Sequence, residues 1–330
     1  MKKLHAKSFC CRSHIRHFGG RRRQCSSCGK TWTSRPKQRG RKRKRGSKLL
    51  LQRYLAHTTL SPNARSKLSG RAPDSFEIKL RRSRDLFLRT TAWSVLPTTF
   101  PIIAIVDALL KRFAGRFWTL YCIFLRRPNE SRAVIVKPYL LPGRETQLGW
   151  REAFERLPVV TRRKIRAVVC DGHRGPVNYA KQHRWLIQRC HFHLLAAIQG
   201  RRSRGRESRH SIEGQRIYSL VKRCLETTNE ADAQTLVYQI ENESLDTKSP
   251  QLRIILRGFV NFYEDYRQYH YHPELHLPTT SNAAESFIGS IEELCHQTRG
   301  FVSPVAFQAW IFALAKLKQT ITCNGRNQQN

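Results

Sequence analysis

The fold of this chain is decided by one short apolar run, Pro101-Ile-Ile-Ala-Ile-Val106, which Asp107 follows directly. Apolar runs of this length and β-branched content are typical of buried strands. Two further strands are expected over the aromatic and β-branched residues 117–125 and over residues 133–139, where Pro138 favours a strand edge or end. The sequence therefore predicts three consecutive strands at the start of a folded domain.

After these strands the hydrophobic period alternates between helix and strand. Residues 147–157 have helical spacing and precede a β-branched run over 165–170. A helix is expected near 175–183, and a short strand over 186–189 leads into another helix from about His191. Three strands followed by helix, strand, helix and strand indicate a mixed α/β domain.

Two carboxylates follow the strongest predicted strands. Asp107 comes directly after residues 101–106, and Asp171 comes directly after residues 165–170. Carboxylates at strand ends can meet at one edge of a sheet, and Mg²⁺ prefers oxygen ligands. Two such ions serve phosphoryl transfer by activating the attacking oxygen and stabilising the leaving one. Taken singly, each aspartate is equally compatible with capping a helix or accepting loop N–H bonds.

Four segments of the chain, in this order, resemble motifs of DDE insertion-sequence transposases of the Mutator-like superfamily. The segments are Ile103-Ala-Ile-Val-Asp107-Ala-Leu-Leu, Val168-Val-Cys-Asp171-Gly-His-Arg-Gly, Gln188-Arg-Cys190-His-Phe-His193, and Thr279-Thr-Ser-Asn282-Ala-Ala-Glu285-Ser-Phe with Thr298-Arg-Gly-Phe301. The first two resemble the first two acidic motifs, the third resembles the Cys-x-x-His signature, and the last resembles the third acidic block. The resemblance covers roughly residues 49–320.

This resemblance implies a ribonuclease-H-like fold, in which a mixed five-stranded sheet is flanked by helices and carries a helical insertion. It also implies that Asp107, Asp171 and Glu285 are the catalytic residues and hold two Mg²⁺ or Mn²⁺ ions. Residues 211–266, which are mainly helical and polar, fit the insertion. The expected boundaries are 100–205 for the first part of the catalytic core, 206–275 for the insertion, 276–320 for the second part with the Glu285 helix, and 321–330 for a tail.

Cys190 and His193 have the ligand types and the spacing of half a zinc site. No second Cys/His pair with similar spacing lies close by in the sequence, whereas a structural zinc site needs four ligands. The resemblance favours a bracing role for the two residues beside the active site. Metal binding remains the alternative.

Residues 1–36 are rich in Cys, His and Arg and are expected to form a zinc-ribbon-like region. Cys25-Ser-Ser-Cys28-Gly has the form of a zinc-knuckle half. The second half is irregular: Cys11 with His14 is the expected ligand pair, and the neighbouring Cys10 and His5 are alternatives. The competing interpretation is a degenerate ribbon that binds no zinc.

The charge of the chain points to a polyanionic partner. The formal net charge is +38 and the sequence pI is about 10.8. Lys and Arg that neutralise phosphates release counterions, so DNA is the expected partner. Residues 37–48 form a basic linker, and residues 49–90 are expected to form a helix-turn-helix with a recognition helix over 75–84. The alternatives to DNA binding are a solvated basic face for the helices and a nuclear-localisation tract for the linker.

Ten basic residues of these two regions are expected to contact DNA. They are Arg39, Arg41, Lys42, Arg43, Lys44 and Arg45 in the linker, and Lys79, Arg81, Arg82 and Arg84 in the recognition helix.

The sequence shows neither a signal peptide nor an apolar stretch long enough to span a bilayer. A cytoplasmic, nucleoid-associated protein with reduced cysteines and no membrane contact is therefore expected. The function that the resemblance implies is a DNA transposase, oligomeric on DNA, that binds terminal inverted repeats, cleaves the element ends and joins them to target DNA. The alternatives are a domesticated, non-catalytic DNA-binding regulator and a structure-specific nuclease of the same fold.

Overall fold

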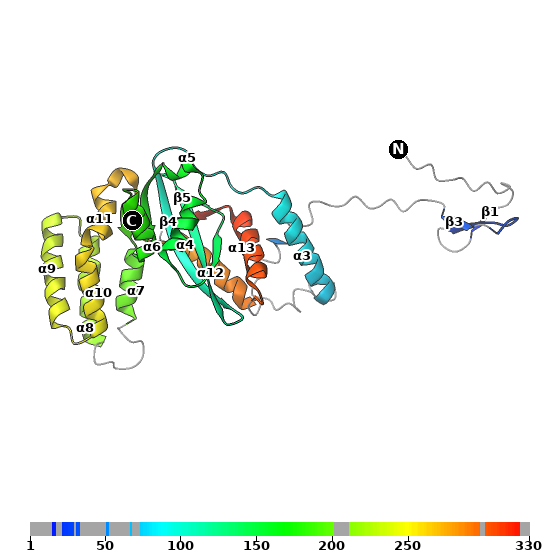
Figure 1. Ribbon diagram of the computed structural model, residues 1–330. Helices are drawn as coiled ribbons and strands as arrows, with labels where there is room; N and C mark the ends of the chain where they lie inside the picture. Colours follow the sequence, from blue (N-terminus) through cyan, green and yellow to red (C-terminus); the bar gives the residue numbers. More distant parts are fainter. Residues whose placement is uncertain are drawn as a thin grey trace. The chain divides into compact units, whose positions relative to one another are not determined.

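The computed structural model describes residues 15–17, 22–29, 31–33, 51–52, 67, 73–200, 211–297 and 301–323. The chain divides into two compact units, residues 1–46 and residues 47–330. Figure 1 shows both units, whose relative placement is not determined. No helix in these described ranges is both long and apolar enough to cross a membrane.

The first unit contains a small antiparallel sheet of three strands, β1 (Ile15–His17), β2 (Arg22–Cys25) and β3 (Thr31–Thr33), in that order. A turn follows Cys25, and the amide of Gly29 donates to the Cys25 carbonyl oxygen at 2.9 Å. Cys25 is buried and Cys28 is exposed. The other two expected zinc ligands, Cys11 and His14, lie outside the described residues, as does the whole basic linker 37–48.

The second unit is an α/β domain with a mixed sheet. Its strands are β4 (Ile102–Phe113), β5 (Arg116–Arg126), β6 (Arg132–Ile135), β7 (Tyr139–Pro142), β8 (Ile165–Cys170), β9 (Leu186–Arg189) and β10 (Thr320–Thr322). The strand order is β10-β6-β5-β4-β8-β9, and β7 also pairs with β5. The pairs on the β5 side of β4 are antiparallel, whereas β4, β8 and β9 are parallel.

The prediction of five strands is wrong in number, because the described sheet has seven. One extra strand arises where the expected strand 133–139 splits into β6 and β7. Pro138 cannot donate to the ladder and restricts the residue before it, so pairing with β5 is interrupted there and resumes at Tyr139. The other is β10, which pairs with the edge strand β6. The segment assigned to a tail from residue 321 therefore begins inside the sheet.

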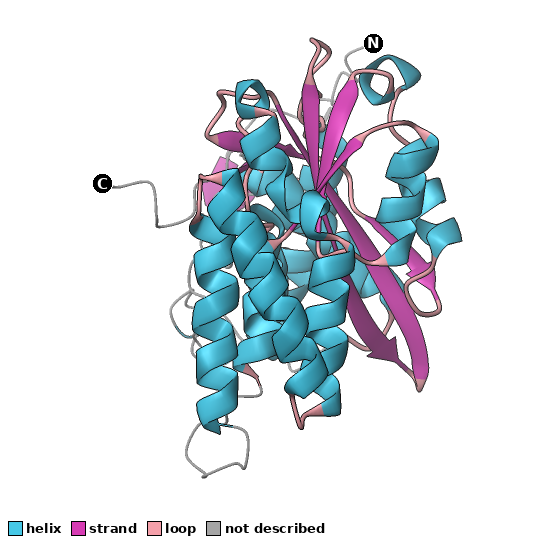
Figure 2. Cartoon of the chain, turned by 90° about the vertical axis from the view of Figure 1, so that its left-hand side faces the viewer, coloured by secondary structure: helices cyan, strands magenta, loops and turns pink. Residues whose placement is uncertain are grey.

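Helices cover both faces of this sheet, as Figure 2 shows. On one face α4 (Gln147–Glu155) and α6 (Arg174–Gln182) enclose a core around Trp150 and Phe154, with the short α5 (Val159–Arg162) nearby. On the other face α12 (Asn282–Gln297) and α13 (Pro304–Lys318) bury Phe287 and Phe307 against β4 and β5. The side chains at Ile103 and Ile105 alternate onto this second face.

The expected recognition helix is longer than predicted. Helix α3 runs over Pro73–Thr90, and its apolar side chains Phe76, Leu80 and Phe87 belong to the same core as α13. The preceding residues that would complete a helix-turn-helix lie outside the described residues, apart from short pieces at 51–52 and at Lys67. Helix α3 is therefore docked on the domain through one face.

The segment expected to form the insertion is a separate helical layer beyond β9. It contains α8 (Ser211–Glu226), α9 (Glu230–Asp246), α10 (Pro250–Asn261) and α11 (Tyr263–Tyr271), followed by the short 3₁₀ helix η1 (Pro273–Leu275). These helices form their own apolar core together with α7 (His191–Gln199). Figure 1 shows this group of helices beside the sheet.

One buried amide joins the insertion to the sheet. Gln188 of β9 is fully buried, and its amide nitrogen donates to the carbonyl oxygens of Tyr266 at 3.1 Å and Arg189 at 2.8 Å. Its carbonyl oxygen accepts from the Tyr269 amide at 2.9 Å. Arg189 adds an ion pair with Asp265 at 3.1 Å. The Gln188 amide therefore links α11 to β9 through main-chain groups, and His191 Nε2, which lies 2.8 Å from the Tyr266 carbonyl oxygen, supports the same contact.

Replacing Gln188 with leucine should lower the free energy of unfolding by about 2–4 kcal/mol, because at least two buried main-chain groups lose their partner. Urea unfolding of the full chain measures this change. The matched control is Gln234→Leu on the exposed side of α9, which should change stability by less than about 0.5 kcal/mol. Equal losses in the two variants would show that Gln188 does not anchor the insertion.

Candidate metal centre

Asp107 lies in the interior of β4, not at its end as the sequence suggested. It is the sixth residue of the strand, because β4 continues to Phe113 and turns into β5 through Ala114 and Gly115, both at positive φ. The parallel ladder with β8 reaches only Ile105, opposite Val169. Asp107 therefore lies just beyond the last residue of β4 that pairs with β8. A polar side chain can be accommodated at this position.

Asp171 follows β8 directly and comes opposite Asp107 when this register is extended by two residues. Its carboxylate accepts the His173 amide at 2.8 Å, which fixes the turn after the strand. Gly172, with φ of +95°, leaves room for Arg189, since a Cβ there would lie 2.7 Å from the Arg189 Nη1 atom. The positive φ therefore favours glycine at position 172, where a larger side chain would also displace the end of the Arg189 side chain.

Glu285 is in the first turn of α12, on the face of the sheet toward which Asp107 and Asp171 alternate. The main chain of Ser281 begins this helix by accepting the amides of Ala284 at 2.8 Å and Glu285 at 3.1 Å. The Ser281 hydroxyl donates to Glu285 Oε1 at 3.0 Å. The buried Ser281 therefore starts the helix and also orients its carboxylate.

The three carboxylates are close enough to affect one another. The pKa of Asp107 is raised to about 7, chiefly by burial, and the charges of Asp171 and Glu285 raise it further. The Ala108 amide, which donates to Asp107 at 2.8 Å, and the positive charge of His193 act in the opposite direction. The negative charges of the three ionised carboxylates repel one another, and a bound divalent cation would offset this repulsion.

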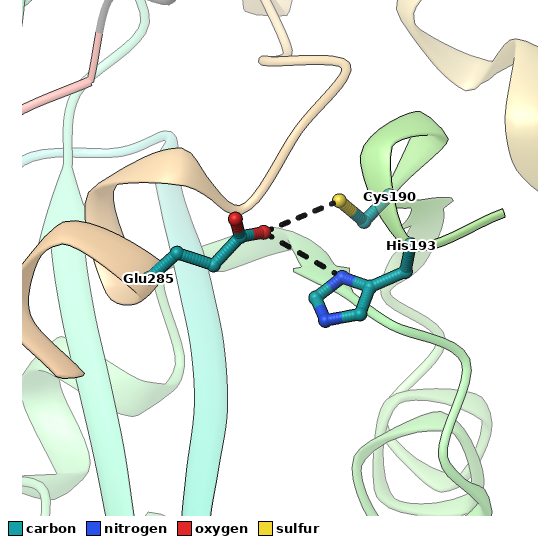
Figure 3. A group of neighbouring side chains, drawn as sticks. All are labelled: Cys190, His193 and Glu285. Atoms are coloured by element: carbon teal, nitrogen blue, oxygen red, sulfur yellow. Dashed lines mark hydrogen bonds and ion pairs between the residues drawn. The ribbon is translucent and has the colours of Figure 1, made fainter. Parts of the chain in front are cut away.

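Cys190 and His193 lie beside Glu285, as Figure 3 shows. Cys190 precedes α7, accepts the Ser281 amide at 3.2 Å, and has its Sγ 3.9 Å from Glu285 Oε1. His193 Nδ1 lies 3.6 Å from the same oxygen. A hydrogen bond with Cys190, supported by the charges of Asp107 and Glu285, raises the pKa of His193 to about 9 against the effect of burial.

A second link between the starts of α7 and α12 is the amide of His191, which donates to the carbonyl oxygen of Thr279 at 2.8 Å. Together with the Ser281–Cys190 contact, it ties the Cys-x-x-His segment to the segment that carries Glu285. This arrangement brings the metal-ligating side chains of Cys190, His193 and Glu285 together.

Glu145 is a further acidic residue near Asp171 that no sequence pattern predicts. Glu145 precedes α4 and accepts the Trp150 indole N–H at 2.6 Å, and His173 Nδ1 lies 3.1 Å from the same carboxylate. Burial raises the pKa of Glu145, and the charge of Asp171 adds to this effect. No motif marks this glutamate, because its position depends on the packing of α4 against the Asp171 turn.

The basic side chains expected to contact DNA have different surroundings in α3. Lys79, Arg81 and Arg82 are exposed, and Arg81 forms an ion pair with Glu77 at 3.1 Å. Arg84 departs from the expectation, because only 12% of its side chain is exposed. It pairs with Asp85 at 2.8 Å, and its guanidinium lies 5.1 Å from the Trp310 ring centroid. Arg84 therefore helps to dock α3 on α13.

Comparison with known proteins adds no further identification: no family model and no curated protein matches the chain.

Proposed function

We propose that the chain is a DNA transposase of the DDE type, built on a ribonuclease-H-like core. The strand order β6-β5-β4-β8-β9 supports the core assignment, since three antiparallel strands are followed by two parallel ones, as this fold requires. On this proposal β7 and β10 are additions at the β5 and β6 side. The helices α8–α11 are the insertion that precedes the glutamate helix.

The observation that carries the proposal is that Asp171, opposite Asp107 in the extended register of β4 and β8, and Glu285, in the first turn of α12, both act on the charge of Asp107. Carboxylate oxygens suit Mg²⁺ or Mn²⁺, and the raised pKa of Asp107 fits a group that a bound cation would keep ionised. Two such ions, when bound, would activate the attacking oxygen and stabilise the leaving 3′-oxygen of DNA.

The protein's own contribution is to hold these carboxylates in place before the reaction. The His173 amide fixes Asp171, the Ala108 amide contacts Asp107, and the Ser281 hydroxyl orients Glu285. Each carboxylate therefore has a partner that limits its rotation. Such support by neighbouring hydrogen bonds is what a phosphoryl-transfer site needs, because its catalysis rests on positioning and charge.

The basic N-terminal region would bind the element ends and the target DNA. Residues 1–48 contain 18 Lys and Arg and no Asp or Glu, which is nearly half of the net charge of +38. Removing residues 1–48 should weaken DNA binding and reduce the slope of log K against log salt by about 0.9 for each lost phosphate contact. Fluorescence anisotropy at several salt concentrations measures both quantities. Unchanged affinity and slope would place the DNA contacts elsewhere in the chain.

The function is tested by incubating the full chain with a DNA end that carries the repeats flanking its own gene, in the presence of Mn²⁺. Cleavage at the repeat ends followed by joining to a target plasmid is the expected result. Binding without cleavage would identify a regulator instead. Cutting at DNA junctions without end specificity or joining would identify a nuclease of the same fold.

A further inference from the structure

Three side chains of different chemistry converge beside the proposed oxygen-ligand site. The ligand atoms offered by Cys190, His193 and Glu285 all lie within 4.8 Å of one another. Cys190 and His193 are three residues apart at the start of α7 and so share one face of the helix. Glu285 reaches them from the first turn of α12, and Figure 3 shows all three side chains directed toward one point.

The distances are close to those of a tetrahedral metal site. Zn–S, Zn–N and Zn–O bonds of about 2.3, 2.0 and 2.1 Å imply ligand-to-ligand separations of about 3.3–3.6 Å. Glu285 Oε1 lies 3.9 Å from Cys190 Sγ and 3.6 Å from His193 Nδ1. The ligand atoms of Cys190 and His193 lie no more than 4.8 Å apart, so side-chain movements of about 1 Å would bring all three to bonding positions around an ion.

The ligand set also selects the kind of ion. Sulfur and imidazole nitrogen suit Zn²⁺ and related transition ions, whereas Mg²⁺ takes oxygen ligands and keeps several waters. Three protein ligands leave a fourth tetrahedral position for water. The thiol proton of Cys190 would be released to solvent on binding, because the thiolate is the ligand.

We propose that Cys190, His193 and Glu285 form a binding site for a zinc-class divalent ion, and that this ion competes with Mg²⁺ or Mn²⁺ for Glu285. The site itself stands on the side-chain geometry, whereas the competition rests on the proposed function of Glu285. Zinc would then act as an inhibitor of the oxygen-ligand site rather than as its cofactor.

Two features make competition the expected outcome. Glu285 Oε1 is already held toward Cys190 and His193 by the Ser281 hydroxyl, so an ion bound there retains the carboxylate in that orientation. The proposed oxygen-ligand site uses the same Glu285 carboxylate, so a cation bound by Cys190, His193 and Glu285 takes one of its ligands. Two cations that share this carboxylate would also repel each other.

Cobalt(II) is the probe for the site, because a cysteine thiolate bound to it gives a charge-transfer absorption band that oxygen ligands do not. The full-length chain with Cys10, Cys11, Cys25 and Cys28 all replaced by Ser serves as the background, which removes the N-terminal cysteines from the measurement. We expect about one thiolate-bound Co²⁺ per chain. Zn²⁺ should displace it, because thiolate and imidazole ligands suit Zn²⁺ well.

Cys190→Ser in this background should abolish the band, and His193→Gln should weaken Co²⁺ binding by about 100-fold or more, since a direct ligand is lost. Cys295→Ser, at a half-buried position later in α12, is the matched control and should keep the band. Circular dichroism establishes that each variant is folded. Absence of the band in the background protein, or its persistence in Cys190→Ser, would overturn the site.

Magnesium titration tests the competition without requiring DNA cleavage. Millimolar Mg²⁺ should weaken Co²⁺ binding to the background protein, and Asp107→Asn should remove this effect while retaining the band. A band that ignores Mg²⁺ would overturn the competition. The two proposals can fail independently. If the Co²⁺ band is present and is lost in Cys190→Ser, the ion site is supported. If no DNA end is cleaved under any ionic condition, the proposed transposase function is wrong even though the ion site stands.

Discussion

Asp107→Asn is expected to lower metal-dependent DNA cleavage and strand transfer by about 1,000-fold or more, while DNA binding changes by only a few-fold. The substitution keeps the volume of the side chain but removes the charge that a divalent ion would neutralise. Loss of one charged ligand would remove several kcal/mol of transition-state stabilisation, and each 1.36 kcal/mol is about tenfold in rate. Gel assays of end cleavage and anisotropy with the same DNA measure the two effects.

The matched control is Asp246→Asn, at the exposed C-terminal end of α9. It removes the same charge from the same protein but leaves the site formed by Asp107, Asp171 and Glu285 intact. Cleavage should therefore remain near the wild-type rate. A purified, folded Asp107→Asn protein that cleaves as fast as this control would remove Asp107 from the site.

Much of the sheet could be predicted because its strands are strongly apolar. The strands over 165–170 and 186–189 were expected with the bounds that the structure gives. The extension of β4 to Phe113 was missed, because Asp107 interrupts the apolar run and was interpreted as the end of the strand. Its tolerance inside the strand depends on where the neighbouring β8 stops, which no local pattern reveals.

The same limit applies to the parts of the fold that depend on distant partners. β10 has only three residues, Thr320–Thr322, and is a strand because β6 offers an open edge. Arg84 has the sequence context of a DNA-contacting residue, yet Trp310 and Asp85 cover most of its side chain. Glu145 is brought near Asp171 only by the packing of α4, so its place near the site could be found only from the structure.

Two residues of the candidate site could be placed from the sequence, because Asp171 follows the end of β8 and Glu285 lies in the first turn of α12. Ser281 and Asn282 can cap a helix, which places Glu285 in its first turn and distinguishes it from the later Glu292 and Glu293. The structure begins α12 at Asn282 and uses the Ser281 hydroxyl to orient the Glu285 carboxylate. The contact with Cys190 and His193 could not be derived from spacing, since it joins positions about 95 residues apart in the chain.

Glu285→Gln is expected to eliminate metal-dependent cleavage, whereas Glu292→Gln should retain most of it. The two residues are two turns apart on α12 and separated by about 10 Å along its axis. Metal ions of a two-ion site are only about 4 Å apart, so both glutamates cannot be direct ligands.

The surroundings of the two glutamates decide between them. Only 24% of the Glu285 side chain is exposed, and its charge contributes to the raised pKa of Asp107. Glu292 is half exposed and pairs with Lys111 at 3.6 Å, four residues beyond Asp107 on β4 and so about 13 Å along the strand. Its loss removes an exposed ion pair worth about 1 kcal/mol or less. Cleavage assays of both variants in Mn²⁺ separate the two assignments, because loss of activity in Glu292→Gln with retention in Glu285→Gln would move the site down the helix.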